Sequence, residues 1–252
     1  MHIFLVNDDG IGAKGIMALF HAAVLRGHRV SMCAPRTQQS AASHRFTLTE
    51  PIYVEPYPVQ GEGSQAFSIT GSPVDCVRIG LFELVKEPVD VLISGINNGY
   101  NAGMAVHYSG TVGAAMEGAI NRLPSIATSI HHEASQAMID HLANFTIEVA
   151  ERYYKQKTPP CTILNINAPN VAAEQLQKPV YAPLSVGNFI DGYERRESPR
   201  AGTYYWLLDG SVTEHPEAGS DMDCLAKNHV VLTLMGNPTC LGCEAFADLE
   251  LF

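Results

Sequence analysis

Two adjacent carboxylates close to the start of the sequence are the residues most suited to chemistry. Asp8 and Asp9 follow the apolar run 3–6, which predicts a buried strand. Open α/β folds place their ligand sites at the carboxyl ends of such strands. Neighbouring carboxylates repel each other, and a bound divalent cation with oxygen ligands relieves that repulsion. We therefore expect a metal site at the end of this strand.

Two further polar segments are expected at the same edge of the sheet. Ser40 lies in a polar loop (residues 36–49) after the second predicted strand, and Asn97 lies in a Gly-rich turn (residues 94–103) after the buried run 89–93. Because such segments can converge in a parallel sheet, Asp8, Asp9, Ser40 and Asn97 would form a hard but incomplete oxygen shell that leaves positions for water and substrate. Mg²⁺ and Mn²⁺ prefer such ligands, whereas Zn²⁺ favours His or Cys. For the Asp pair alone, a helix cap and a solvated turn are the competing interpretation.

A candidate anion site follows at Ser109, Gly110 and Thr111, where a helix is expected to begin. The first-turn N–H groups of a helix are unpaired and its N-terminus is positive, which suits a phosphate. The competing interpretation of this segment is a plain Ser or Thr helix cap. Together with Asn98 in the preceding turn, these residues are our candidate phosphate-binding group.

The elements that must position these residues alternate between strand and helix patterns, which predicts an α/β fold with a mostly parallel sheet and helices on both faces. The predicted strands lie at residues 3–6, 28–34, 52–54, 66–69, 89–93, 125–130 and 162–166. The predicted helices include residues 13–25, one that begins at Ser72-Pro73 and carries a stripe to Val85, and one that follows Thr111. A further helix is expected between the last two strands.

The pattern changes after Ala168, and we divide the chain into a core (1–170) and a C-terminal region (171–252). Residues 186–208 are rich in Tyr, Gly and charge, which indicates a β-rich arm, and a last strand is expected to return to the core. The cluster Tyr204, Tyr205 and Trp206, with nearby arginines, is typical of an interface. A hairpin folded back over the core is the alternative.

Composition limits the functional class. The 252 residues include 16 basic and 26 acidic ones, a formal net charge of −10 that disfavours binding to duplex nucleic acid. We find no targeting signal and no apolar run long enough to span a membrane, so a cytoplasmic protein is expected. Three of the six cysteines lie in or beside apolar runs and are expected to be reduced core residues, and Cys240-Leu241-Gly242-Cys243 lacks the partner residues of a zinc site. His131-His132 is expected to be a solvated pair.

Five segments together resemble the SurE family (stationary-phase survival protein E). They are Asn7-Asp8-Asp9-Gly10 with the following 13–16, residues 71–77, residues 94–103, residues 108–118, and Asn165-Ile166-Asn167 with the arm that ends at Trp206. They occur in the family's order and cover nearly the whole chain. The resemblance implies a Rossmann-like domain with an extended arm, and homodimers or homotetramers built through that arm.

The resemblance also implies a divalent-metal-dependent phosphatase that acts on nucleoside monophosphates, a 5′/3′-nucleotidase with activity on other phosphate esters. One Mg²⁺ or Mn²⁺ per subunit is expected on Asp8, Asp9, Ser40 and Asn97, with Asp8, Asp9 and Asn97 serving catalysis. The sequence does not decide whether Asp8 is a base, a nucleophile or only a ligand. A regulatory protein that binds nucleotide without turnover is the main alternative, and a dinucleotide-dependent oxidoreductase is a weaker one.

Overall fold

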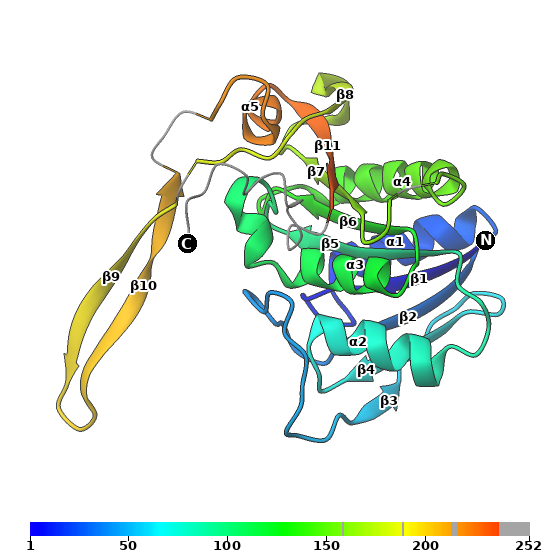
Figure 1. The fold of residues 1–252 in the computed structure, drawn as a ribbon, viewed down its shortest axis with the longest axis horizontal. Coiled ribbons are helices and arrows are strands. Elements are labelled where there is room, and N and C mark those ends of the chain that lie inside the picture. Colours follow the sequence, from blue (N-terminus) through cyan, green and yellow to red (C-terminus); the bar gives the residue numbers. More distant parts are fainter. Residues whose placement is uncertain (158, 188, 213–215, 237–252) are drawn as a thin grey trace, which may run out of the picture.

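The computed structural model describes residues 1–157, 159–187, 189–212 and 216–236. Its centre is a nine-stranded sheet in the order β3-β4-β2-β1-β5-β6-β7-β11-β8 (Figure 1). The strands are β1 (His2–Val6), β2 (Arg29–Pro35), β3 (Val54–Pro56), β4 (Gln65–Ile69), β5 (Val91–Asn98), β6 (Ser125–Ile130), β7 (Ile163–Ala168), β8 (Gln177–Tyr181) and β11 (His229–Met235). The run from β4 to β7 is parallel, whereas β3 and β11 are antiparallel to β4 and β7. The predicted α/β class is confirmed.

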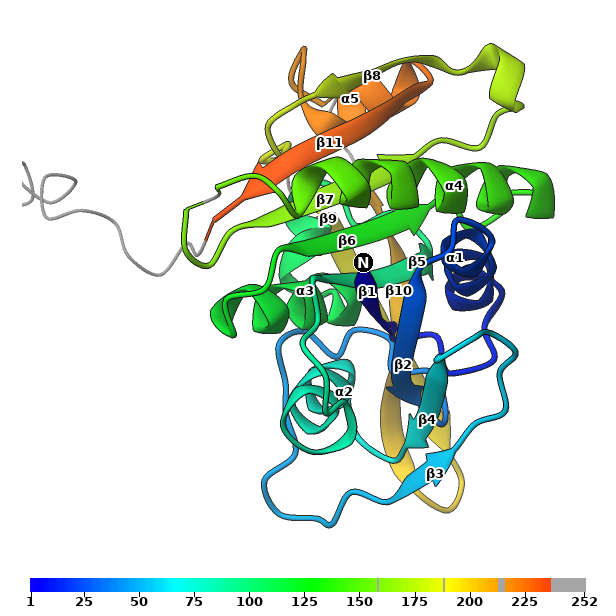
Figure 2. The same ribbon diagram turned by 90° about the vertical axis from the view of Figure 1, so that its right-hand side faces the viewer.

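Helices cover both faces of the sheet (Figure 2). On one face lie α1 (Lys14–Leu25) and α4 (Gln136–Tyr153), and on the other α2 (Pro73–Ile79) and α3 (Gly110–Ile120). Side chains of β1 alternate between the two cores: Ile3 and Leu5 pack with the α1 side, and Phe4 and Val6 with the α2 side. This two-sided burial explains why residues 3–6 are a continuous apolar run.

The start of α2 has the local chemistry that the sequence predicts. The Ser72 hydroxyl accepts from the N–H of Asp75, the Asp75 carboxylate accepts from the N–H of Ser72, and Pro73 occupies the first turn. The regular helix ends at Ile79, however, and continues as a π-helical segment, Gly80–Leu84. The expectation of one helix to Val85 is therefore wrong in geometry, although Val85 is buried.

Strand β5 is longer than predicted, and this changes the setting of the candidate site. Residues 94–98 were expected to be a turn, but they continue the strand, with Asn97 and Asn98 paired to Ser129 and Ile130 of β6. Gly95 has a φ of +138°, and a Cβ there would overlap the carbonyl oxygen of Thr128. Strand β3 also lies two residues beyond the predicted 52–54.

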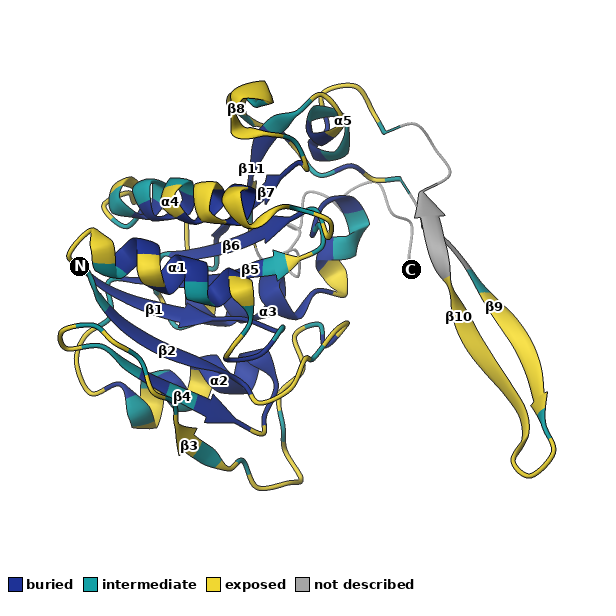
Figure 3. Cartoon of the chain, turned by 180° about the vertical axis from the view of Figure 1, so that it is seen from behind, coloured by how far each residue is buried: buried dark blue, intermediate teal, exposed yellow. Residues whose placement is uncertain are grey.

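The arm is an antiparallel hairpin of β9 (Phe189–Ser198) and β10 (Gly202–Val212) that projects away from the sheet (Figure 1). Figure 3 shows its mostly exposed surface, and Trp206 keeps 59% of its area accessible. The alternative of a hairpin folded over the core is wrong. The expected return to the core is confirmed, because β11 pairs with β7 after α5 (Asp221–Ala226).

Cys33 and Cys76 are free and buried, as expected of reduced core residues, whereas Cys240 and Cys243 lie outside the described residues. Short 3₁₀ turns occur at Gly103–His107 and Ala173–Gln175. Across the described ranges, no helix has both the length and the hydropathy that crossing a membrane requires.

Candidate functional site

The Asp pair lies in a tight turn at the carboxyl end of β1. The Asn7 side chain closes this turn, donating to the Gly10 carbonyl at 2.8 Å and accepting from the Gly10 N–H at 3.2 Å. Asp8 is 5% exposed and Asp9 is half-buried. Within the described part of the chain, neither carboxylate has a salt-bridge partner.

Asp8 is held by the start of α3. The Thr111 hydroxyl donates to Asp8 Oδ1 at 2.6 Å, and the Thr111 N–H donates to Oδ2 at 3.2 Å. A Cβ at Gly110 would lie 3.1 Å from Asp8 Oδ2, so glycine permits this close approach of helix and carboxylate. Burial raises the pKa of Asp8 to about 6, in part opposed by the Thr111 hydrogen bond.

Asp9 joins the ends of β1 and β5. Its Oδ2 accepts from the backbone N–H of Asn98 at 3.1 Å, and its Oδ1 accepts from the Gln38 side chain at 3.2 Å. Burial raises the pKa of Asp9, and these two hydrogen bonds oppose the shift. The predicted proximity of the β1 and β5 ends is therefore met through a backbone group of Asn98.

Asn97 lies at the half-buried end of β5. Its amide nitrogen donates to the Gly99 carbonyl at 2.8 Å, which leaves Oδ1 as the atom that can face a cation. Two asparagines of β7 hold the segment after it. The Asn101 N–H donates to Asn167 Oδ1 at 2.9 Å, and the Asn101 carbonyl accepts from Asn165 Nδ2 at 2.8 Å. These contacts anchor the segment that follows β5 to β7.

The loop 36–49 is bonded to the same edge of the sheet through Gln39 and Ser43. The Gln39 N–H donates to the Asp8 carbonyl at 2.7 Å, and the Ser43 hydroxyl donates to the His107 carbonyl at 2.8 Å. Ser40, next to Gln39, is exposed, and no hydrogen bond within the described residues engages its hydroxyl. The fold thus brings the Ser40 segment beside Asp8 and leaves the hydroxyl available.

The predicted phosphate-binding segment has its side chains already engaged. Ser109 caps α3 by accepting from the Val112 N–H at 3.1 Å, and both polar groups of Thr111 serve Asp8. Gly110 contributes a first-turn N–H of α3, the kind of group that receives an anion. Because the Thr111 and Val112 N–H groups are already engaged, an anion at this point would meet the Gly110 N–H in place of the two hydroxyls.

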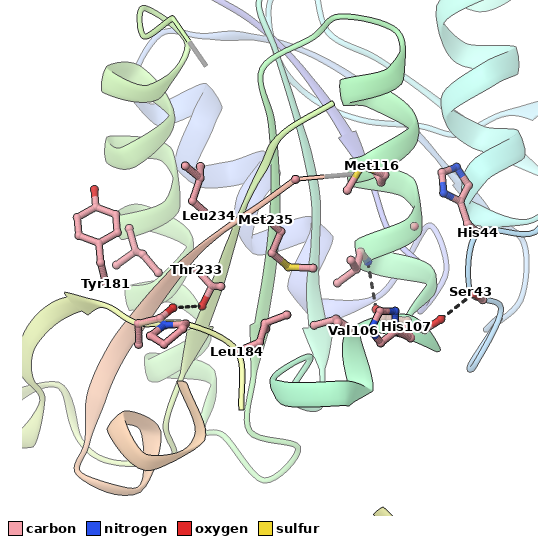
Figure 4. A pocket seen from close by; sticks show the side chains of 17 residues that line it. Ser43, His44, Val106, His107, Met116, Tyr181, Leu184, Thr233, Leu234 and Met235 are labelled. Carbon is pink, nitrogen blue, oxygen red and sulfur yellow. Dashed lines mark hydrogen bonds between the residues drawn. The ribbon is translucent and has the colours of Figure 1, made fainter. Parts of the chain in front are cut away.

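Two cavities adjoin the sheet edge at which β1 and β5 end. One of about 340 Å³ is lined by Asp9 and Asn98 together with Lys14, Gln38 and His132. The other, of about 780 Å³, lies by Ser43, His107 and Ser109 and is walled by apolar residues that include Leu184 and Met235 (Figure 4). Gln38, Lys14 and His132 were not predicted as site residues, because their positions follow from loop geometry that no local pattern encodes.

The donor set suits a hard divalent cation. It combines two partly desolvated carboxylates that lack a cationic partner with the Asn97 amide oxygen and the Ser40 hydroxyl. Mg²⁺ and Mn²⁺ take such oxygen ligands and retain waters in the remaining positions. The residues present therefore fit the expected ion.

Comparison with known proteins gives the family of the chain. Residues 3–189 match the family model described as Survival protein SurE. The chain belongs to the SurE family. The match includes Asp8, Asp9, Ser40, Asn97 and the start of α3.

Individual relatives extend over nearly the whole chain. A protein of Thermosipho africanus named 5′-nucleotidase SurE is 36% identical over 233 residues, covering 92% of this chain and 90% of the relative. One of the same name from Prochlorococcus marinus is 39% identical over 221 residues, covering 87% and 84%. The crystal structure of the SurE protein from Aquifex aeolicus superposes with a TM-score of 0.79 at 28% identity, covering 98% of this chain and 97% of that one.

Proposed function

We propose that this SurE chain is a divalent-metal-dependent phosphatase that hydrolyses nucleoside monophosphates as a 5′/3′-nucleotidase, and that it also accepts other phosphate monoesters. The observation that carries the proposal is the Asp8–Asp9 pair, tied to the start of α3 and to the end of β5 at one sheet edge. The relatives' name, 5′-nucleotidase, agrees with it.

Asp8, Asp9, Ser40 and Asn97 would hold one Mg²⁺ or Mn²⁺. When bound, such an ion supplies positive charge to a phosphoryl group and lowers the pKa of a bound water. Thr111 orients Asp8, while Gln38 and the Asn98 backbone orient Asp9. The Gly110 N–H at the start of α3 and the Asn98 side chain would receive the phosphoryl oxygens, which carry more charge in the transition state.

The arm belongs to the same proposal as the surface through which homodimers or homotetramers form. Tyr204, Tyr205 and Trp206 are exposed on β10, and Arg195 and Arg196 lie opposite on β9. Aromatic and Arg side chains of this kind are enriched at protein interfaces. We also propose a cytoplasmic location and retain the division at residue 170 as a hypothesis. Sedimentation of the full chain beside Trp206→Ser tests the arm: a wild-type monomer contradicts its role.

The activity is tested by phosphate release from a panel of nucleoside monophosphates and p-nitrophenyl phosphate, first with EDTA and then with Mn²⁺ or Mg²⁺ restored. We expect release to stop with the chelator, to return with the metal, and to fall by orders of magnitude in Asp9→Asn. Intact nucleotide after long incubation with metal would instead indicate a regulatory binding protein. Binding of NAD or NADP without added metal would indicate an oxidoreductase.

A further inference from the structure

A second group of potential metal ligands lies near the carboxyl ends of β1 and β5 but does not include Asp8 or Asp9. His131, His132 and Glu133 follow directly after β6, and one potential ligand atom from each lies within 4.8 Å of those of the other two. It is the one such His, Cys, Asp or Glu group of three or more found in the described ranges. None of the three residues takes part in a salt bridge with another described residue.

The two imidazoles are held together by ring contacts. Their centroids are 4.4 Å apart with an interplanar angle of 27°, and Tyr100 meets the His131 ring edge-on at 5.3 Å. The Glu133 N–H donates to His131 Nδ1 at 3.2 Å, so the Nε2 side of this ring points elsewhere. The pair is therefore partly ordered before any ligand arrives, although His132 and Glu133 are exposed.

We propose that His131, His132 and Glu133 form a second cation site, for a transition metal of the Zn²⁺, Co²⁺, Ni²⁺ or Cu²⁺ type. Imidazole nitrogens select these ions, whereas Mg²⁺ prefers the oxygen shell at Asp8 and Asp9. Three protein ligands leave open positions, which water fills, as in other sites with an incomplete protein shell. The site does not depend on the proposed phosphatase activity.

Binding requires a small local adjustment. Ligand nitrogens about 2.0–2.1 Å from a tetrahedral Zn²⁺ lie closer together than 4.8 Å, so the side chains must close on the ion. Coordination through His131 Nε2 places the ring proton on Nδ1 and gives up the 3.2 Å bond from Glu133. Because this bond is exposed, water replaces it at little cost.

The His131–His132–Glu133 group shares a cavity with Asp9. His132 lines the 340 Å³ cavity that is also lined by Asp9 and Asn98, and Asn98 pairs in register with Ile130, the residue before His131. A cation on the His pair therefore adds positive charge to the wall of the cavity that opens on Asp9. Occupancy of this site is expected to change the KM for an anionic substrate more than kcat.

The experiment measures binding of Zn²⁺ alone to the full chain, by equilibrium dialysis and calorimetry. The test background is Asp8→Asn with Asp9→Asn, which removes the oxygen site, and it is compared with the same background carrying His131→Ala and His132→Ala. We expect the first protein to retain one Zn²⁺ per subunit and the second to lose it. Each single His change is expected to weaken binding by about 10–100-fold or more.

Cu²⁺ as a second probe reports the ligand type directly. Its electron paramagnetic resonance spectrum should show nitrogen couplings that disappear in the double His variant and remain in His141→Ala, an exposed histidine of α4. Equal Zn²⁺ stoichiometry with and without His131 and His132 would overturn the proposal, as would the same loss in His141→Ala. Circular dichroism of each variant verifies that the fold is intact. Neither result depends on phosphate release, so failure here is distinguishable from failure of the proposed activity.

Discussion

Thr111 donates both its hydroxyl and its backbone N–H to the carboxylate of Asp8, one to each oxygen. The two residues are 103 positions apart in the sequence, and Thr111 is fully buried. This contact fixes the orientation of Asp8 and ties the carboxyl end of β1 to the N-terminus of α3. The proposed metal ligand Asp8 and the helix start proposed to bind phosphate are therefore in direct contact.

Replacing Thr111 with Val removes the hydroxyl and keeps the shape of the side chain. We expect Thr111→Val to weaken Mn²⁺ binding or metal-dependent phosphate release by about 10–100-fold, because a partner that orients a ligand is lost. Thr111→Ser keeps the hydroxyl and is expected to stay close to wild type. Calorimetric titration with Mn²⁺ and initial rates measure both effects; equal loss in the two variants would point to packing rather than the hydrogen bond.

Ser40 is the proposed ligand with the fewest structural contacts, and its role can be isolated. If its hydroxyl binds the ion, Ser40→Ala raises the Mn²⁺ dissociation constant by about tenfold and leaves thermal stability unchanged, since the side chain is exposed. Thr37→Ala, also exposed in the loop 36–49, is the matched control. An unchanged dissociation constant in Ser40→Ala would remove this residue from the ligand set.

The buried carboxylate of Glu117 predicts a pH-dependent part of the stability. His44 donates to Glu117 at 2.9 Å and Arg78 does so at 2.9 Å, and the His44 hydrogen bond is the main reason why the pKa of Glu117 is lowered. Since the unfolded chain then binds the proton more tightly, this stabilisation is complete above the ordinary Glu pKa and is lost as pH falls through the folded value.

Glu117→Gln tests this prediction by urea unfolding at pH 5, 4 and 3. The difference in unfolding free energy between wild type and Glu117→Gln should be largest at pH 5 and should shrink towards pH 3. Glu148→Gln, on the exposed part of α4, controls for the removal of a carboxylate as such. A difference that grows as pH falls would contradict the assignment.

Local sequence was sufficient where the structure depends on local chemistry. The apolar run of β1, the helical spacing of α1 and the Ser cap of α2 were predicted from neighbouring residues, and the structure has them. The Ser109 cap of α3 was the competing interpretation of its segment, and the structure has it as well. The meeting of the carboxyl ends of β1 and β5 was predicted for a different reason, because parallel strands share a carboxyl end, and the hydrogen bond from the Asn98 N–H to Asp9 shows it.

The end of β5 was predicted wrongly because it depends on distant residues. Gly95, Asn97 and Asn98 are turn formers by local preference. They stay in the strand because Gly95 packs against the Thr128 carbonyl and the two asparagines pair with β6. The same applies to the anchoring of Asn101 by Asn165 and Asn167, which no spacing along the chain encodes.

Asp221 connects the segment that follows β5 to the base of the arm. Its fully buried carboxylate accepts from the N–H of Gly103 at 2.7 Å and from the N–H groups of Ser185 and Met222 at 2.8 Å each. Gly103 ends the segment that follows Asn97, and Ser185 lies shortly before β9. A single side chain thus fixes the site loop against the chain that leads into the arm.

We expect Asp221→Ala to lower the free energy of unfolding by several kcal/mol, at about 1–3 kcal/mol for each buried N–H left without an acceptor. Because the segment that follows Asn97 loses its anchor, the affinity for metal should fall as well, by more than the reduced stability explains, when it is measured well below the melting temperature. Asp223→Asn is the matched control on the same helix, since its carboxylate serves the Gly219 N–H and Lys227 and does not reach the loop. Asp223→Asn should keep the metal affinity of wild type. If Asp221→Ala lost stability but bound Mn²⁺ as wild type does, Asp221 would support α5 and the arm base alone, and the position of Asn97 would depend on Asn165 and Asn167.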